Sequence, residues 1–206
     1  MNNEVKIILN HISKKFHQYY LYKDICIDIE SKDKLVITGN NGSGKSTLLK
    51  IIAGHTSPSS GNIQYFLNAQ ELPKIQWHQY ISIAAPYMSV MEEFSFREII
   101  HHLTVFRQFQ TDIREISDLS ELDIHLHKPV KYFSSGMKQR IRLLIAILDA
   151  APVLLLDEPC SNLDAASIQW YEKMIKQFAM HKTVIVFSNS QPHEYFFCNK
   201  HFSLSQ

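Results

Sequence analysis

The sequence is poor in the features that mark several classes of protein. Its 206 residues include three cysteines, with no C-x-x-C pair, and Lys plus Arg (21) nearly balance Asp plus Glu (20). The dispersed cysteines argue against a disulfide framework or a thiolate zinc site, and the balanced charge gives no reason to expect a nucleic-acid partner. The longest apolar stretch, residues 141–156, is broken by two charges and a proline, so it is too interrupted to span a bilayer.

Targeting signals and unusual composition are also missing. The first residues contain no basic segment followed by an apolar one, so we expect no secretory signal and a location in the cytoplasm. Hydrophobic residues make up 45% of the chain and charged residues 20%, which is typical of a globular domain and excludes a collagen-like or disordered chain. The length fits one domain with room for an inserted subdomain.

The first third of the chain has the order strand, loop, helix, strand. Alternating or continuous apolar residues predict strands at 5–9, 25–29, 35–37 and 63–66. The third of these strands runs into a glycine-rich turn, and the segment 46–53 that follows is predicted as a helix ending at Gly54. A turn at 57–61 then leads back to the last of the four strands.

The middle third is predicted to be a helical insert spanning about residues 86–135. Ser95 and Glu98 have the spacing of a capping box, and residues 112–122 predict a second, shorter helix. After the insert, helices and strands alternate: a helix at 140–148, a strand at 153–156, a helix at 166–178 and a strand at 183–187. Both strands are apolar throughout, as strands buried on both faces must be. The predicted fold is therefore α/β with a parallel sheet.

One glycine-rich segment fits the pattern G-x-x-x-x-G-K-[ST] and lies between a predicted strand and a predicted helix, the context that this motif requires. Its residues are Gly39, Asn40, Asn41, Gly42, Ser43, Gly44, Lys45, Ser46 and Thr47. Such a loop turns backbone N–H groups toward phosphate oxygens, and the N-terminus of the following helix adds positive partial charge. We expect the Lys45 ammonium to reach the terminal phosphates and the Ser46 hydroxyl to bind Mg²⁺.

The apolar strand at 153–156 ends in two carboxylates, Asp157 and Glu158. At the carboxyl end of a buried parallel strand they should face the same crevice as the phosphate loop. Asp157 then suits a second anchor for Mg²⁺, and Glu158 suits a general base that polarises the attacking water.

Two further segments complete a family pattern. Phe133–Arg140 reads F-S-S-G-M-K-Q-R shortly before the acidic pair, and Ser161–Asp164 reads S-N-L-D just after it. With these motifs in this order, the chain resembles an ATP-binding cassette (ABC) ATPase over essentially its whole length. The resemblance implies a P-loop NTPase fold, in which residues 1–85 and 136–206 form a RecA-like core with an antiparallel β subdomain around the helical insert.

The resemblance also implies how the chain works. In the family, the segment corresponding to Ser134, Ser135, Gly136 and Met137 opens a helix and contacts the γ-phosphate held by another protomer. The implied ligands are ATP and Mg²⁺. The implied partners are a second copy in an ATP-dependent homodimer, or a related cassette in a heterodimer, and a transmembrane permease that the chain serves at the cytoplasmic face of the membrane. The compact length is similar to that of small export ATPases, including those of heme-exporter type.

Phe16 stands 23 residues before Gly39, where the family has an aromatic residue that stacks on adenine. Tyr19, Tyr20 and Tyr22 compete for this role on the sequence alone, and a place in the core is the alternative for Phe16.

Two positions depart from the family pattern. The segment Ile83–Met88 stands where the family has a glutamine-bearing loop, yet it contains no glutamine; Glu92 or Glu93 is a substitute, or the two form a solvated acidic pair. Asn189 stands where the family has a histidine. Its amide donates a hydrogen bond to a γ-phosphate but carries no positive charge, and His193 reaches the site only if the loop is unusual.

Four histidines lie in or beside the predicted helical insert. His101, His102, His125 and His127 lack acidic or cysteine partners at ligand spacing, so they are interpreted as surface residues.

A soluble ABC-type ATPase acting on DNA or ribosomes is an alternative function, disfavoured because the chain has no second cassette, long coiled coil or basic face. An ATP-binding module with weak hydrolysis is a second alternative, motivated by the missing glutamine and histidine.

Overall fold

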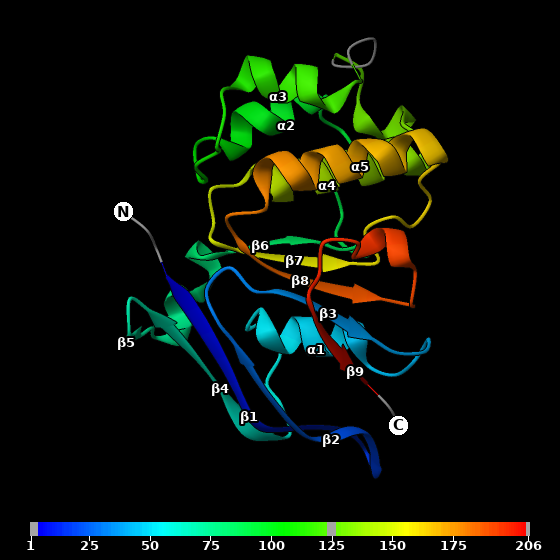
Figure 1. Cartoon of the computed structure of the whole chain (residues 1–206). Coiled ribbons are helices and arrows are strands. Elements are labelled where there is room, and N and C mark those ends of the chain that lie inside the picture. The colour runs from blue at the N-terminus through cyan, green and yellow to red at the C-terminus, as the bar shows by residue number, and fades with distance from the viewer. Residues whose placement is uncertain (1–3, 123–126, 205–206) are drawn as a thin grey trace.

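The computed structural model describes residues 4–122 and 127–204 as two sheets with helices packed on them (Figure 1). The antiparallel sheet has the strand order β2-β1-β4-β5, and the parallel sheet has the order β6-β7-β8-β3-β9. The strands are β1 (Val5–Phe16), β2 (Tyr19–Ile29), β3 (Lys34–Thr38), β4 (Ser60–Leu67), β5 (Gln70–Glu71), β6 (Ile81–Ala84), β7 (Val153–Asp157), β8 (Thr183–Ser188) and β9 (Lys200–Ser203).

The helices form layers on both sides of the parallel sheet. α1 lies between the two sheets, α4 and α5 cover the opposite face of the parallel sheet, and α2 and α3 lie outside them (Figure 1). The α-helices are α1 (Lys45–Ile52), α2 (Phe96–Leu103), α3 (Ile113–Ser120), α4 (Ser135–Leu148) and α5 (Ala165–Phe178), and the short 3-10 helices are η1 (Lys74–Gln79), η3 (Val130–Tyr132) and η4 (Pro192–Glu194).

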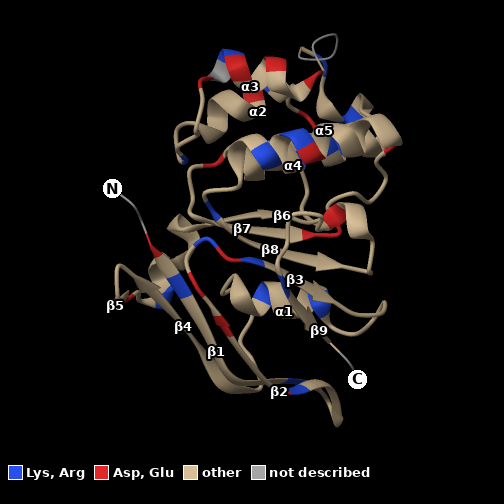
Figure 2. Cartoon of the chain, viewed as in Figure 1, with Lys and Arg blue, Asp and Glu red and all other residues tan. Residues whose placement is uncertain are grey.

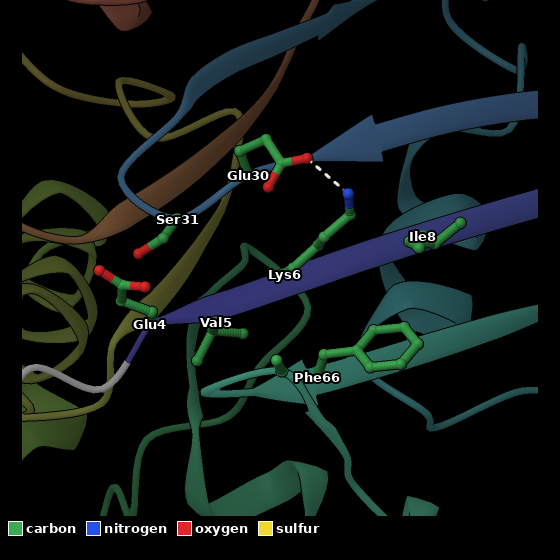
Figure 3. A pocket seen from close by; sticks show the side chains of 8 residues that line it. Glu4, Val5, Lys6, Ile8, Glu30, Ser31 and Phe66 are labelled. Atoms are coloured by element: carbon green, nitrogen blue, oxygen red, sulfur yellow. Dashed lines mark hydrogen bonds and ion pairs between the residues drawn. The ribbon is translucent and has the colours of Figure 1, made fainter.

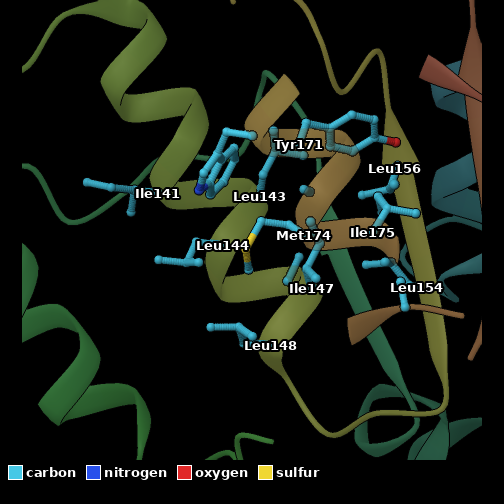
Figure 4. Packing of buried hydrophobic residues seen from close by; sticks show 14 of the residues in the cluster. Ile141, Leu143, Leu144, Ile147, Leu148, Leu154, Leu156, Tyr171, Met174 and Ile175 are labelled. Atoms are coloured by element: carbon cyan, nitrogen blue, oxygen red, sulfur yellow. The ribbon is translucent and has the colours of Figure 1, made fainter. Parts of the chain in front are cut away.

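The hydrophobic core has one layer on each face of the parallel sheet. Every residue of β7 and β8 is buried, as the apolar sequences predicted. Leu154 and Leu156 point toward α4 and α5 and pack with Tyr171 and other residues of that layer (Figure 4). Leu155, one step along the strand, belongs to the layer around α1. Because alternate side chains of a strand point to opposite faces, one short strand contributes to both layers.

Side-chain caps fix where four helices begin, and Asp164 is the cap of α5. Ser95 and Glu98 form the predicted capping box of α2, in which the Ser95 N–H donates to Glu98 Oε2 over 2.8 Å. Asp112 caps α3 by accepting from two backbone N–H groups. The helix predicted from residue 140 starts five residues earlier, because Ser134 Oγ accepts from the Met137 N–H and serves as the cap of α4.

The predicted α/β fold with a parallel sheet, an antiparallel β subdomain and additional helices is confirmed, with differences at its edges. The first two strands are longer than predicted and form a hairpin that turns between Phe16 and Tyr19. β6 and β9, at the two edges of the parallel sheet, were not predicted. Both have four residues, and β9 reads K-H-F-S, which gives no apolar run to detect.

Arg107 fastens the segment after α2 to the core. Its Nε lies 2.6 Å from Asp149 Oδ2, and its two terminal nitrogens donate to the backbone carbonyls of His78 and Ile81 over 2.7 and 2.6 Å. A planar guanidinium satisfies three acceptors from different elements at once, which makes this contact a fixed attachment point.

Acidic and basic residues are interspersed along the ribbon of the described chain (Figure 2). β7 and β8 are uncharged until Asp157, at the carboxyl end of β7. None of the described helices is long and apolar enough to cross a membrane.

Candidate functional site

The predicted phosphate loop connects β3 to α1, and its shape depends on glycine. Gly42 and Gly44 have φ angles of +83° and +99°, which side chains other than glycine rarely adopt. A Cβ atom on Gly44 would lie 2.5 Å from Leu21 Cδ2, and one on Gly39 would lie 2.5 Å from Ser43 Oγ. α1 has no side-chain cap at its N-terminus. Its first N–H groups are therefore available to an anion.

Lys45 is held above this loop by neutral oxygens. Its Nζ donates to the carbonyl oxygens of Gly39 and Asn40, over 2.7 and 3.1 Å, and to Asn189 Oδ1. Burial lowers the pKa of the Lys45 ammonium, while the charges of Glu158 and Asp157 oppose this shift. The contacts orient the ammonium without neutralising it, so its charge is available to phosphate oxygens.

Asn189 links the phosphate loop to the acidic pair. Its Nδ2 donates to Asn41 Oδ1 and to Glu158 Oε1, each over 2.6 Å, while its Oδ1 accepts from Lys45. The residue comes directly after β8, whose carboxyl end lies beside those of β3 and β7. The structure thus brings Lys45, Glu158 and Asn189, the three predicted catalytic residues, into one hydrogen-bonded group.

Asp157 and Ser46 present oxygen atoms beneath this group. Asp157 is 2% exposed, and its Oδ1 has no hydrogen-bond partner among the residues that the structure describes. Burial is the main cause that raises its pKa, and a hydrogen bond with Ser46 acts in the opposite direction. A buried carboxylate oxygen without a partner, next to a serine hydroxyl, fits a hard divalent cation such as Mg²⁺.

Glu158 and Phe16 face a common cavity with the phosphate loop. Its lining includes Phe16, Leu21, Glu158 and loop residues from Asn41 to Thr47. Phe16 is 55% exposed, which rules out the alternative of a core residue. The tyrosines at 19, 20 and 22 do not line this cavity; Tyr22 is buried, and Tyr20 lies against Lys23.

The Ser134–Met137 segment lies elsewhere. It opens α4, on the face of the parallel sheet opposite α1 (Figure 1), and none of its residues lines the cavity of the phosphate loop. A Cβ atom on Gly136 would lie 3.0 Å from the Asn162 carbonyl oxygen, so this segment packs against the loop that follows β7. One chain does not bring its own two predicted phosphate-binding segments together.

The segment Ile83–Met88 offers a tyrosine where the family pattern has glutamine. Lys50 Nζ lies 4.3 Å from the centre of the Tyr87 ring. Burial and the charge of Asp157 raise the pKa of the Tyr87 hydroxyl to about 12, so it stays a neutral hydrogen-bonding group near the acidic pair. Glu92 and Glu93 pair instead with Lys138 and Lys131. This geometry favours their interpretation as a surface acidic pair.

Glu194 is a residue that the sequence analysis missed. It is 3% exposed, and its carboxylate accepts from the Cys160 N–H over 3.2 Å and from the Ser188 hydroxyl. Burial, with the charges of Glu158 and Asp157, raises its pKa to about 7. It therefore connects the loop after β7 to the loop after β8. In the polar run S-N-S-Q-P-H-E, nothing distinguishes it from a solvated acid.

Of the histidines that the sequence analysis singled out, His193 borders the catalytic group. His193 lines a cavity together with Glu158 and Asn189, while His101, His102 and His127 are exposed and His125 falls outside the described residues.

A second hollow lies apart from this group, on the outer side of β1 and β4, where Lys6 Nζ lies 2.6 Å from Glu30 Oε1 (Figure 3). Lys6 is paired with Glu30, and Glu4 adds a second carboxylate to the lining, so the hollow is acidic on balance and does not suit a phosphate.

A phosphate loop at the N-terminus of α1 and an acidic pair at the end of a parallel strand define a P-loop nucleotide-binding domain. The chain belongs to the ABC transporter family, whose profile, described as "ABC transporter", matches residues 22–161. Members of this family carry an ATP-binding cassette, so the family implies that the P-loop domain binds ATP.

The chain is similar to several curated proteins of this family. It is 31% identical over 192 residues to the Nod factor export ATP-binding protein I of Rhizobium johnstonii, covering 88% of this chain and 60% of that protein. It is 30% identical over 173 residues to the molybdate/tungstate import ATP-binding protein WtpC of Pyrococcus horikoshii, covering 81% of this chain and 48% of that protein. The chain thus spans about half the length of the curated relatives it matches.

Solved structures share the fold. A putative ABC transporter ATP-binding protein from Pyrococcus furiosus superposes with a TM-score of 0.79 at 23% identity, covering 97% of both chains. A dimeric post-hydrolysis ATP-binding cassette bound to ADP and Pi gives a TM-score of 0.79 at 19% identity, covering 97% of this chain and 94% of that one.

Proposed function

We propose that this chain binds and hydrolyses ATP as a nucleotide-bridged dimer and thereby drives a separate membrane permease. The observation that carries the proposal is the hydrogen-bonded group in which Asn189 joins Lys45 of the phosphate loop to Glu158 at the end of β7. Two members of the group, Lys45 and Glu158, line the cavity in which a nucleotide would place its terminal phosphate, and Asn189 lies directly behind them.

Each residue of the group has a role in the proposed reaction. Lys45 and the N–H groups at the start of α1 hold the β- and γ-phosphates. Glu158 accepts a proton from the attacking water. Asn189 keeps one Nδ2 hydrogen on Glu158, and its second Nδ2 hydrogen, which Asn41 Oδ1 accepts in the free chain, turns to the γ-phosphate when ATP binds. Phe16, exposed at the edge of the cavity, stacks on the adenine. When Mg²⁺ is bound by Ser46 and Asp157, it neutralises charge on the phosphate oxygens.

The dimer follows from the separation of the two phosphate-binding segments. Ser134–Met137 lies on the far side of the sheet from the phosphate loop, so a lone chain leaves the γ-phosphate open on one side. Two chains related by a two-fold axis place this segment of each against the nucleotide of the other. The partner is a second copy or a related cassette.

The permease is proposed to dock on the helical insert, here taken as residues 86–135 between core segments 1–85 and 136–206. Seven large apolar side chains among the described residues of the insert are exposed: Tyr87, Met88, Met91, Phe94, Val105, Phe106 and Tyr132. An apolar surface of this kind marks a protein interface. Such docking places the chain at the cytoplasmic face of a membrane, and the small size is similar to that of compact export ATPases such as the heme-exporter type.

A second candidate function is an ATP-binding module with weak hydrolysis. Asn189 in place of a histidine and Tyr87 in the segment without a glutamine favour it, because neither supplies the charge or the metal ligand of the family pattern. A soluble ATPase acting on nucleic acid is less favoured, because charges of both signs are mixed over the described surface (Figure 2).

Sedimentation and turnover of the Glu158→Gln variant test the proposal. With Mg-ATP the variant should bind nucleotide, turn over at least about 100-fold more slowly than the parent, and sediment as a dimer; with ADP it should sediment as a monomer. Gly136→Asp should prevent the dimer, whereas Gly136→Ala, which adds a Cβ atom without charge, should retain it. Parent-rate hydrolysis in Glu158→Gln would refute the general-base role, and a dimer of Gly136→Asp would refute the composite site.

A further inference from the structure

A second cluster of reactive side chains lies outside the nucleotide site, on the hairpin of β1 and β2. His11 Nδ1 is 2.5 Å from Asp24 Oδ1 and 3.6 Å from Cys26 Sγ. One ligand atom from each of the three residues lies within 4.8 Å of the others. All three are exposed, and the side chains of His11 and Asp24 are 75% and 72% accessible. An ion in solvent therefore has direct access to the cluster.

The hairpin brings the three residues to one face. Asp24 and Cys26 are two positions apart on β2, where Asp24 has a φ of +54° at an irregularity of the pairing with β1, and both side chains reach His11. His11 lies across from them on β1, where the pairing with β2 shifts between Leu9 and Ile12. The φ of His11 is +52°, so the backbone of β1 bulges at this residue. β4 passes close to the bulge at Gly61, where a Cβ atom would lie 2.3 Å from the His11 carbonyl oxygen.

The donor atoms suit a divalent transition-metal ion. Thiolate, imidazole and carboxylate are the ligand types of zinc sites, and two negative charges balance a divalent cation. Ordinary Zn–S and Zn–N lengths in a tetrahedral site separate sulfur from nitrogen by about 3.5 Å, close to the 3.6 Å between Cys26 and His11. The 2.5 Å between His11 and Asp24 is a hydrogen bond, and ligation would replace it with a separation of about 3.3 Å.

Cys26 differs from the two other cysteines. Cys160 is buried, and burial raises the pKa of its thiol; burial also raises the pKa of the half-buried Cys198 thiol, to about 12. Both therefore stay protonated and poorly reactive. Cys26 is exposed and beside a histidine and a carboxylate. The spacing of cysteines in the sequence argued against a thiolate site, but pairing of β1 with β2 supplies the missing ligands to a single cysteine.

We propose that His11, Asp24 and Cys26 form a binding site for a divalent transition-metal ion of the zinc type, separate from the nucleotide site. Three protein ligands leave a fourth position for water or for an external ligand. The ion joins β1 to β2, five residues before Phe16 at the tip of the same hairpin. It would therefore stabilise an edge strand whose backbone pairs with β1 alone among the described strands.

Titration of the tag-free chain with Co²⁺ tests the site. A thiolate ligand gives a charge-transfer absorption, which should saturate at one ion per chain, be displaced by Zn²⁺ and be unaffected by Mg²⁺, which prefers oxygen ligands. Cys26→Ser should abolish the absorption, and His11→Gln and Asp24→Asn should weaken binding at least about ten-fold. Cys198→Ser is the matched control and should bind as the parent does.

Alkylation gives a second readout that does not depend on colour or on ATP. Zn²⁺ should slow the modification of Cys26 by iodoacetamide, measured by mass spectrometry, and a chelator should restore it; the His11→Gln variant should lose this protection. Any of three results would overturn the proposal: absorption that persists in Cys26→Ser, no protection of Cys26 by Zn²⁺ in the parent, or saturation at one ion per two chains. None of these results bears on ATP hydrolysis, so the site and the proposed function fail independently.

Discussion

The phosphate loop and the loop after β8 meet where Asn189 contacts Lys45, yet they are held in place differently. The phosphate loop takes its shape from its own glycines and from the start of α1. The loop after β8 depends on a buried acid, Glu194, whose partners are Cys160 in the loop after β7 and Ser188 at the end of β8. The first loop is therefore specified by local sequence, and the second by contacts between segments that are distant along the chain.

Removal of the charge from the phosphate loop should have the largest effect. Lys45→Ala is expected to weaken ATP binding at least about 100-fold, because it deletes charge-assisted hydrogen bonds to the phosphates. Calorimetric titration with Mg-ATP measures the loss. Lys50→Ala, on the same helix with its ammonium over the Tyr87 ring, is the control and should bind within a few-fold of the parent. Parent-like affinity in Lys45→Ala would contradict the assignment of the loop.

A change at Asn189 should have the next largest effect, on turnover. Asn189 offers the γ-phosphate a neutral donor where a histidine would add positive charge. Loss of one preorganised interaction of this kind typically costs on the order of 10²–10³ in rate, so we expect slow basal hydrolysis by the parent. Asn189→His should raise the steady-state rate of phosphate release. Asn189→Ala should lower it, because Glu158 and Lys45 then lose a shared partner. An unchanged or lower rate in Asn189→His would show that the loop is built around asparagine.

The contrast between the loops explains what the sequence could predict. The phosphate loop, the acidic pair and both strands beneath them follow from local patterns: glycine spacing, an apolar run and a terminal carboxylate. The fold class follows from the same patterns, because β7 and β8 are apolar at nearly every position. Glu194 could not be found this way, because a glutamate in a polar segment is buried only by the packing of other elements around it.

The edge strand β9 and the cluster on the hairpin could not be predicted from the sequence for a similar reason. β9 pairs with β3 through its backbone, and its exposed side chains carry no periodic signal. The cluster on the hairpin needed the register of β1 against β2, and a shift of one residue would place His11 on the other face. Contacts set by long-range register are therefore the part that sequence patterns leave open.

Two glycine substitutions separate the local backbone requirement of the phosphate loop from its contacts with β2. Both Gly42→Ala and Gly44→Ala place a side chain at positive φ, which costs about 1 kcal/mol. At Gly42 the space is open, whereas at Gly44 the Cβ atom meets Leu21 and Tyr22. We expect Gly44→Ala to lose a further ~1–3 kcal/mol in urea unfolding. Equal losses in the two variants would show that contacts with β2 do not constrain the loop.

The smallest effect should come from Glu194, and it should depend on pH. Its pKa in the folded chain, about 7, is above its ordinary value of 4.5, so the folded state retains a proton that the unfolded state releases. Its contribution to stability is therefore complete below about pH 4.5 and is lost as the pH rises to about 7, by about 1 kcal/mol per pH unit. Glu194→Gln should flatten the stability curve across this window, measured by urea unfolding at a series of pH values.

Glu172→Gln is the matched control for this last variant. Glu172 lies on α5 and pairs with Lys176 at the surface, so its loss should shift the whole curve by less than about 0.5 kcal/mol without changing its slope. If Glu194→Gln keeps the slope of the parent, the buried acid does not hold a proton in this pH range. The loop after β8 would then be as insensitive to pH as the phosphate loop, and the difference between the two loops would reduce to where their contacts lie in the sequence.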